Sequence, residues 1–208
     1  MDSLLWASPA EDLEIRRAGG STTLKGRFPY GKKAVLSDGG RRGRPRKEQF
    51  RRGAFKHSIE SETQEIHVLV GHDFNRPIAR KLDGSLKLRD TAAALEFETT
   101  IAPDLAEVSY VRDALTLLGA GLTAGVSPGF RLPPERAVPR RVAEEITEEP
   151  DDPENGMHRA LIRTINEAIL FELSIVTRPA YPETQVEARN WTPTVDPARP
   201  HPLQFWRP

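Results

Sequence analysis

The apolar residues of this 208-residue chain occur in short runs that glycines and prolines interrupt; it has 15 Gly and 18 Pro. From Glu65 to His72, the residues Ile66, Val68 and Val70 alternate with others at the two-residue period of a strand. The segments 85–88, 92–101 and 121–130 predict further strands, and residues 13–40 predict two short strands joined by a turn. So many short strands favour a β-barrel or a β-sandwich.

One segment has a helical period instead. From Asp104 to Leu118 the apolar residues recur every three or four positions, and Gly119 follows as a stop signal. The predicted fold class is therefore mainly β with helices (α+β), in the form of a β-barrel or a β-sandwich with helical additions.

Irregular segments divide the chain. Residues 41–55 are basic and rich in turn formers, which predicts a loop, and residues 39–47 are its most basic part. Residues 131–156 are proline-rich and increasingly acidic, which predicts a long surface excursion. The domain is expected to span residues 13–190, with an N-terminal extension at 1–12 and a proline-rich mobile tail at 191–208.

Charge and composition exclude several classes of function. The 30 basic residues balance the 30 acidic ones, so net charge does not direct the chain to nucleic acid or to a membrane. The absence of Cys excludes disulfides and thiolate catalysis. No apolar run approaches the roughly 20 residues that span a bilayer. We expect a soluble intracellular protein without a metal or another cofactor.

Three polar residues occupy strand-like positions where apolar residues are the rule. His72 continues the face of Ile66, Val68 and Val70, and so is expected to point inward. Ser127 lies between Gly125 and Gly129 in "GLTAGVSPGF", which leaves space around its hydroxyl group.

The third of these residues is Glu172, which shares a face with Leu170, Ser174 and Val176, where a carboxylate needs a partner or a proton. A serine hydroxyl becomes a strong nucleophile when a histidine takes its proton and a third group orients that histidine. Ser127, His72 and Glu172 fit those three roles.

Each residue also has a purely structural interpretation. His72 could cap a turn through Asp73, Ser127 could be a small residue in a bulge, and Glu172 could pair with an arginine. The remaining histidines are less well placed, because they follow the basic loop, occupy the opposite strand face, or lie beside the acidic excursion or in the tail: His57, His67, His158 and His201.

Four blocks in order resemble the prohead (capsid maturation) proteases of tailed phages, over about residues 13–186. The blocks are "RRGAF" at 51–55, "VLVGHDFNRPIAR" at 68–80, "GLTAGVSPGF" at 121–130 and "FELSIVTRPAYPETQVE" from Phe171. The resemblance implies a serine endopeptidase with a fold similar to the herpesvirus assemblin proteases, a β-barrel surrounded by helices. It also implies processing of capsid protein, scaffold protein or itself, in the host cytoplasm within the immature capsid or from a prophage.

The resemblance makes Ser127 the nucleophile and His72 the general base. The assemblin relatives have a second histidine as the third member, and because no matching block here offers one, Glu172 is the choice for that role. Pro128 has no N–H, so the residue after the nucleophile cannot donate to the oxyanion. The Gly129 amide, Arg131 and Arg178 are the alternative donors.

The basic segment supports a rival from another class. "RGRP" at 42–45 resembles the core of the AT-hook, whose arginines enter the minor groove of DNA. The bland interpretation is a solvated charged loop, whose positive charge the acidic segment 144–154 could offset. A third possibility is a non-enzymatic β-barrel component of the capsid shell, in which removal of Ser127 abolishes no activity.

Overall fold

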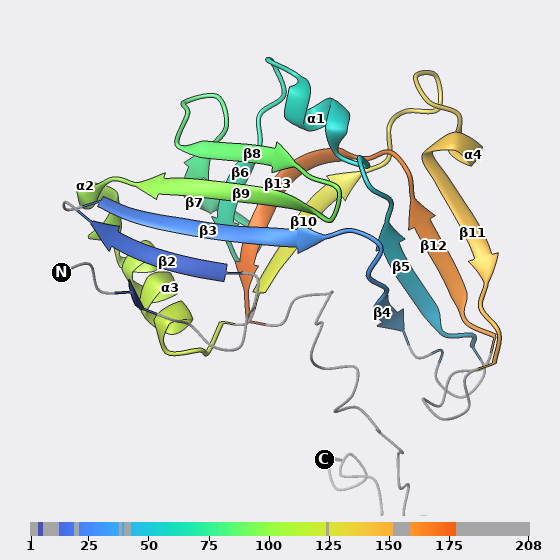
Figure 1. The fold of residues 1–208 in the computed structure, drawn as a ribbon, viewed down its shortest axis with the longest axis horizontal. Coiled ribbons are helices and arrows are strands. Elements are labelled where there is room, and N and C mark those ends of the chain that lie inside the picture. The colour runs from blue at the N-terminus through green and yellow to red at the C-terminus, as the bar shows by residue number, and fades with distance from the viewer. Residues whose placement is uncertain are drawn as a thin grey trace, which may run out of the picture.

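The computed structural model describes residues 4–5, 13–18, 21–37, 39, 43–123, 125–151 and 159–177. Their strands form three sheets (Figure 1). The first sheet has the order β1 (Leu4–Leu5), β2 (Leu13–Ala18), β3 (Ser21–Pro29), β9 (Ala94–Ile101), β8 (Leu86–Asp90). The second has the order β10 (Gly125–Arg131), β13 (Ile169–Val176), β6 (His67–Val70), β7 (Asp73–Arg80). The third has the order β11 (Glu144–Glu148), β12 (Leu161–Ile165), β5 (Arg46–Phe50), β4 (Ala34–Ser37).

The predicted mainly β class with helices is confirmed. The segments 85–88, 92–101 and 121–130 contain strands as expected, although residues 13–40 form β2, β3 and β4 rather than two strands. Within the described part of the chain the three sheets stay separate and do not close into a barrel. β1 lies inside the predicted N-terminal extension and pairs with β2, whereas residues 191–208 lie outside the described residues.

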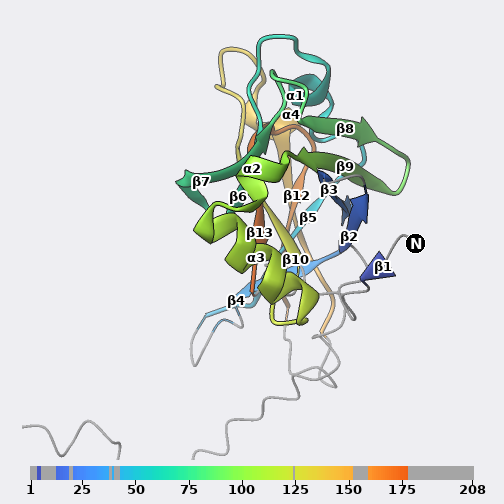
Figure 2. The ribbon, with the colours of Figure 1, turned by 90° about the vertical axis from the view of Figure 1, so that its left-hand side faces the viewer.

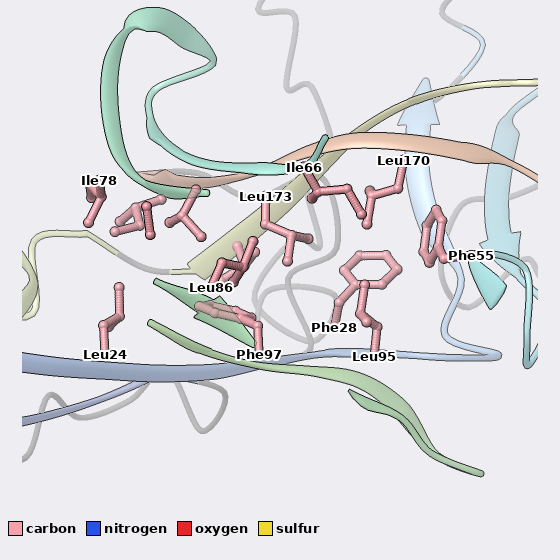
Figure 3. Close-up of a cluster of buried hydrophobic side chains, with 14 of the residues drawn as sticks. Leu24, Phe28, Phe55, Ile66, Ile78, Leu86, Leu95, Phe97, Leu170 and Leu173 are labelled. Atoms are coloured by element: carbon pink, nitrogen blue, oxygen red, sulfur yellow. The ribbon is translucent and has the colours of Figure 1, made fainter. Parts of the chain in front are cut away.

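The main core lies between the first and second sheets. Figure 3 shows Leu24 and Phe28 of β3 and Leu95 and Phe97 of β9 facing side chains of the second sheet. The facing residues are also fully or nearly fully buried: Ile66, Ile78, Leu170 and Leu173. Burying each large apolar side chain contributes about 1.5–3 kcal/mol, so this layer holds the two sheets face to face.

The predicted helix over 104–118 is two helices, α2 (Pro103–Ala106) and α3 (Ser109–Gly119). Val108 separates them, because its ψ of 131° is extended. The helical period survives in α3, where Val111, Leu115 and Leu118 are buried in the core. Figure 2 shows α2 and α3 in front of the strands, at the end of the molecule that lies on the left of Figure 1. None of the described helices is long and apolar enough to span a membrane.

The third sheet corrects two predictions. Residues 41–55 are not only a loop, because residues 46–50 form β5, and the supposed surface excursion contains α4 (Arg140–Ala143) and β11. β12 pairs in parallel with β5 and antiparallel with β11. β5 thus becomes a strand beside a partner more than 100 residues later in the chain, and β11 becomes a strand because the same partner, β12, pairs with it.

A cluster of phenylalanine rings joins the third sheet to the main core. The ring of Phe50 in β5 packs edge-on against Phe28 of β3, with centroids 5.3 Å apart, and against Phe130 of β10 at 4.8 Å. Phe55, which precedes α1 (Lys56–Glu60), lies 4.9 Å from Phe50. The aromatic residue of the "RRGAF" block, Phe55, is therefore a packing residue of the core.

Candidate functional site

The serine of "GLTAGVSPGF" lies in β10, beside the central strand β13. Ser127 pairs with Ser174 and Gly129 pairs with Glu172 in the antiparallel register of the two strands. Directly opposed residues of an antiparallel pair share a face, as do alternate residues along a strand. Ser127, Gly129, Glu172 and Ser174 therefore form one polar patch on the second sheet.

Glu172 is a buried carboxylate with two side-chain partners. Its side chain is only 4% exposed, and its Oε1 lies 2.7 Å from Nδ1 of His72. Its Oε2 accepts a hydrogen bond of 2.5 Å from Oγ of Ser174. Among the described residues the side-chain partners of this carboxylate are therefore a histidine and a serine, and no arginine pairs with it there.

His72 is not part of a strand, which corrects the prediction that it continues the inward face of Ile66, Val68 and Val70. β6 ends at Val70, which pairs with Asp73, so Gly71 and His72 form a two-residue hairpin loop. Their φ angles of 67° and 62° are both positive, as a type I′ turn requires. The imidazole is consequently half exposed instead of pointing into the core.

The hairpin turn is fastened to β13 by its backbone. The Gly71 N–H donates to the carbonyl oxygen of Ile175 at 3.0 Å, and the His72 N–H donates to Oγ of Ser174 at 2.9 Å. The strand that carries Glu172 therefore also sets the position of the His72 backbone.

This arrangement determines what the imidazole can do. A carboxylate beside Nδ1 favours the tautomer that carries its proton there, which leaves Nε2 as an acceptor. Within the described ranges no group hydrogen-bonds Nε2, and Oγ of Ser127 likewise has no hydrogen-bond partner there. Ser127 is 8% exposed on the same sheet. The site offers an oriented base, and a hydroxyl group lies on the strand beside its carboxylate.

The candidate oxyanion donors differ in their surroundings. Pro128 lies in β10 between Ser127 and Gly129, as the sequence requires. The guanidinium carbon of Arg131 lies 5.0 Å from the ring centroid of Phe171, a cation–π contact that holds this side chain over the ring. Arg178 lies outside the described residues.

The profile of a protein family, described as Caudovirus prohead serine protease, matches residues 35–196. The chain belongs to this family. Membership confirms the resemblance inferred from the four blocks, and places the chain among serine peptidases of the phage prohead. The chain has no match among curated proteins or among solved structures.

Sequence reasoning about this family member missed Ser174. The residue was noted only for sharing a face with Glu172, yet its fully buried hydroxyl contacts both Glu172 and the turn of His72. The available signal was its position two residues after a buried glutamate in the closing block "FELSIV", because alternate strand residues are neighbours on one face.

Two cations of the basic segment 39–47 form ion pairs with the acidic segment, which weakens the AT-hook alternative. Arg44 forms a 2.8 Å ion pair with Glu148 and donates to the carbonyl oxygen of Arg159 at 2.7 Å. Lys47, which is nearly buried, pairs with Glu149. The acidic segment therefore does neutralise part of the basic segment, as the bland interpretation expected.

Proposed function

We propose that this chain is an active serine endopeptidase that uses Ser127 as nucleophile, His72 as general base and Glu172 as the group that orients His72. The observation that carries the proposal is the 2.7 Å contact between Nδ1 of His72 and Oε1 of Glu172, on the sheet that carries Ser127. Family membership supports the serine peptidase chemistry.

In the first half-reaction, Oγ of Ser127 bonds to the carbonyl carbon of the scissile peptide while its proton passes to Nε2 of His72. Glu172 remains a carboxylate and stabilises the imidazolium ion. The C–N bond then breaks, and the leaving amine takes the proton from Nε2. An acyl-enzyme on Ser127 is the product of this half-reaction.

In the second half-reaction, a water molecule replaces the leaving amine. His72 takes a proton from this water, whose oxygen bonds to the acyl carbon, and the proton returns to Oγ of Ser127 as the ester bond breaks. No step requires a metal or an organic cofactor. The half-exposed imidazole has the solvent access that this water needs.

The proposed substrates are the major capsid protein and the scaffold protein inside the immature capsid, together with the C-terminal segment of the protease itself. The family's place in the prohead supports capsid proteins as substrates. A fold related to that of the assemblin proteases is part of this proposal and is supported by the resemblance in sequence, although the sheets of the described residues do not close into a barrel.

Co-expression with the capsid protein of the neighbouring gene tests the function. Intact masses of both proteins are compared between the wild type and Ser127→Ala. The proposal expects defined cleavage products that depend on Ser127, and their masses locate the cleavage positions. Products that persist with Ser127→Ala contradict it.

A further inference from the structure

Ser174 lies at the centre of the second sheet, where a side chain has no access to solvent. It is 0% exposed, and its strand β13 lies between β10 and β6. Its neighbours across the two ladders are Ser127 of β10 and Leu69 of β6. A hydroxyl group at such a site must find its partners within the protein.

The partners of Ser174 are the two halves of the proposed base system. Its Oγ donates to Oε2 of Glu172 at 2.5 Å and accepts the backbone N–H of His72 at 2.9 Å. The other oxygen of Glu172 meets Nδ1 of His72 at 2.7 Å. Three hydrogen bonds thus form a closed ring through His72, Glu172 and Ser174.

The ring leaves little freedom to the imidazole. The Ser174 hydroxyl group donates its proton to Oε2 of Glu172, and this hydrogen bond fixes the carboxylate so that Oε1 faces His72. The same Oγ accepts a hydrogen bond from the backbone N–H of His72. His72 is a non-glycine residue with a φ of 62°, and such a backbone conformation needs support from its surroundings. Ser174 therefore restrains the imidazole from both ends, through its carboxylate partner and through its backbone.

We propose that Ser174 is the positioning residue of this site, which holds the tautomer and the place of His72 without touching substrate. The kinetic consequence of this proposal, a lower kcat without Ser174, rests on the proposed function. Its structural consequence, a fixed His72 tautomer, is independent of catalysis and can be measured in an inactive protein.

The first experiment is nuclear magnetic resonance of the full chain labelled with ¹⁵N-histidine, in the Ser127→Ala background. Long-range ¹H–¹⁵N spectra report which ring nitrogen of His72 carries the proton, and His72→Asn identifies its signals. We expect the Nδ1–H tautomer of His72, and a mixture of tautomers once Ser174→Ala is added. An unchanged His72 signal in the Ser174→Ala protein overturns the proposal.

Ser58→Ala is the matched control. Ser58 is also 0% exposed, and its Oγ accepts the backbone N–H of Leu170, in the same strand β13, at 3.0 Å. The Ser58→Ala substitution therefore removes an equally buried hydroxyl group, which is hydrogen-bonded to the same strand but not to His72. We expect Ser58→Ala to leave the His72 tautomer unchanged. A mixture of tautomers in Ser58→Ala would show that general loosening of β13 is the cause, and would overturn the specific role of Ser174.

The second experiment measures kinetics with Ser127 restored, on a peptide that spans the cleavage site found by co-expression. Ser174→Ala should lower kcat by about 10- to 100-fold, the range seen when a metal-ligating histidine loses its hydrogen-bond partner, and leave KM unchanged. In a Glu172→Ala background the same change should cost little more, because that variant has already removed the group that links Ser174 to Nδ1 of His72. Equal losses in both backgrounds overturn the proposal.

Ser174→Cys covers the case in which the alanine variant does not fold, since it keeps nearly the same volume with a weaker donor. It should give a smaller loss of kcat and a partial mixture of tautomers, and wild-type values for both overturn the proposal. If the wild type cleaves nothing, the proposed function fails, while the spectra still decide whether Ser174 positions His72.

Discussion

A side-chain carbon at Gly129 would lie 2.0 Å from Oε1 of Glu172, far closer than two non-bonded atoms can approach. The carboxylate that contacts His72 therefore lies directly over the α-carbon of Gly129, in the strand that carries Ser127. Gly129, which lies two residues after Ser127, thus leaves room for the carboxylate that contacts His72.

Gly129→Ala should consequently displace Glu172 from His72 and lower cleavage by at least about 100-fold, within the range expected when general base catalysis is impaired. Gly119→Ala is the matched control, because nothing lies within 4 Å of the added carbon at the end of α3. It should keep full activity and change stability by no more than about 1 kcal/mol. Kinetics and thermal unfolding of the two variants check this, and a fully active Gly129→Ala protein would show that Glu172 is dispensable.

Ser127→Ala and His72→Ala should each abolish processing and leave the fold intact, because they remove chemistry more than packing. Their losses should not add in the double variant, since the residues act as a unit. His72→Asn removes the imidazole but preserves the turn, because Asn tolerates a positive φ well, so it tests the chemical role of His72 alone. Intact-mass analysis of the co-expressed capsid protein, with circular dichroism of each variant, provides the measurement. Cleavage by a folded Ser127→Ala variant would contradict the proposal.

Glu172→Gln should reduce the rate less than the loss of His72, since an amide replaces an orienting group in part. The Gln side chain can still accept a hydrogen bond from Nδ1 or from Ser174, but it has no charge to stabilise the imidazolium ion. Single-turnover rates of the two variants make the comparison. A wild-type rate for Glu172→Gln would mean that another residue orients the imidazole.

Acid should destabilise the third sheet through Glu144 and Glu149. Burial opposes ionisation of both, but hydrogen bonds and charge from Arg163 and Arg140 keep the pKa of Glu144 below its ordinary value of 4.5. Lys33 and Lys47 do the same for the pKa of Glu149. Because the folded pKa lies below the unfolded one, the stabilisation is complete above pH 4.5 and is lost as pH falls through the folded value.

Denaturant unfolding between pH 7 and pH 3 measures this loss, and Glu144→Gln should make the curve flatter in acid while costing about 1–3 kcal/mol at pH 7. Glu145→Gln is the control, since that side chain is 52% exposed, and its contact with Arg51 is 3.5 Å long. It should change neither quantity appreciably. If the free energy of unfolding of Glu144→Gln falls with pH in acid as steeply as that of the wild type, the Glu144 carboxyl group is not a cause of the acid destabilisation.

Neutralising Arg42, Arg44 and Arg46 should leave proteolysis unchanged, and retention of DNA by the wild type should be negligible at physiological salt. The ion pair of Arg44 with Glu148 favours this outcome, because a paired guanidinium is less available to a phosphate or a groove. Titration of A·T and G·C duplexes at two salt concentrations tests it. Steep salt dependence with preference for A·T tracts would instead support a minor-groove contact.

The active protein should trim its own C-terminus after Val186, while Ser127→Ala keeps its full mass. This segment lies outside the described residues, and its sequence predicts no helix or strand, because it has prolines at 193, 197, 200, 202 and 208. A tether also raises the effective concentration of the segment at the site. Identical C-termini in the two proteins, under conditions where the wild type cleaves its capsid substrate, would exclude trimming.

The sequence was sufficient for features that depend on local periodicity and on blocks of residues. Alternation predicted β9 and β10, the helical period predicted the buried face of α3, and four ordered blocks led to the family that the profile match confirms. It also selected His72 and Glu172, which the structure brings into contact. The predictions of β9, β10 and α3 succeed because side-chain periodicity follows directly from backbone geometry.

Tertiary structure decided what depends on distant partners. β5 pairs along one edge with β12, more than 100 residues later in the chain, and no window of sequence around β5 reveals that partner. The Gly71–His72 turn interrupts a pattern that otherwise reads as a continuous strand, since two positive φ angles close the hairpin with β7. Ser174 gained its place beside His72 only because β13 lies between β10 and β6, with the turn docked onto it. Hydrogen bonds between residues about 100 positions apart are set by the register of the sheets, which packing of the whole core fixes and local sequence does not.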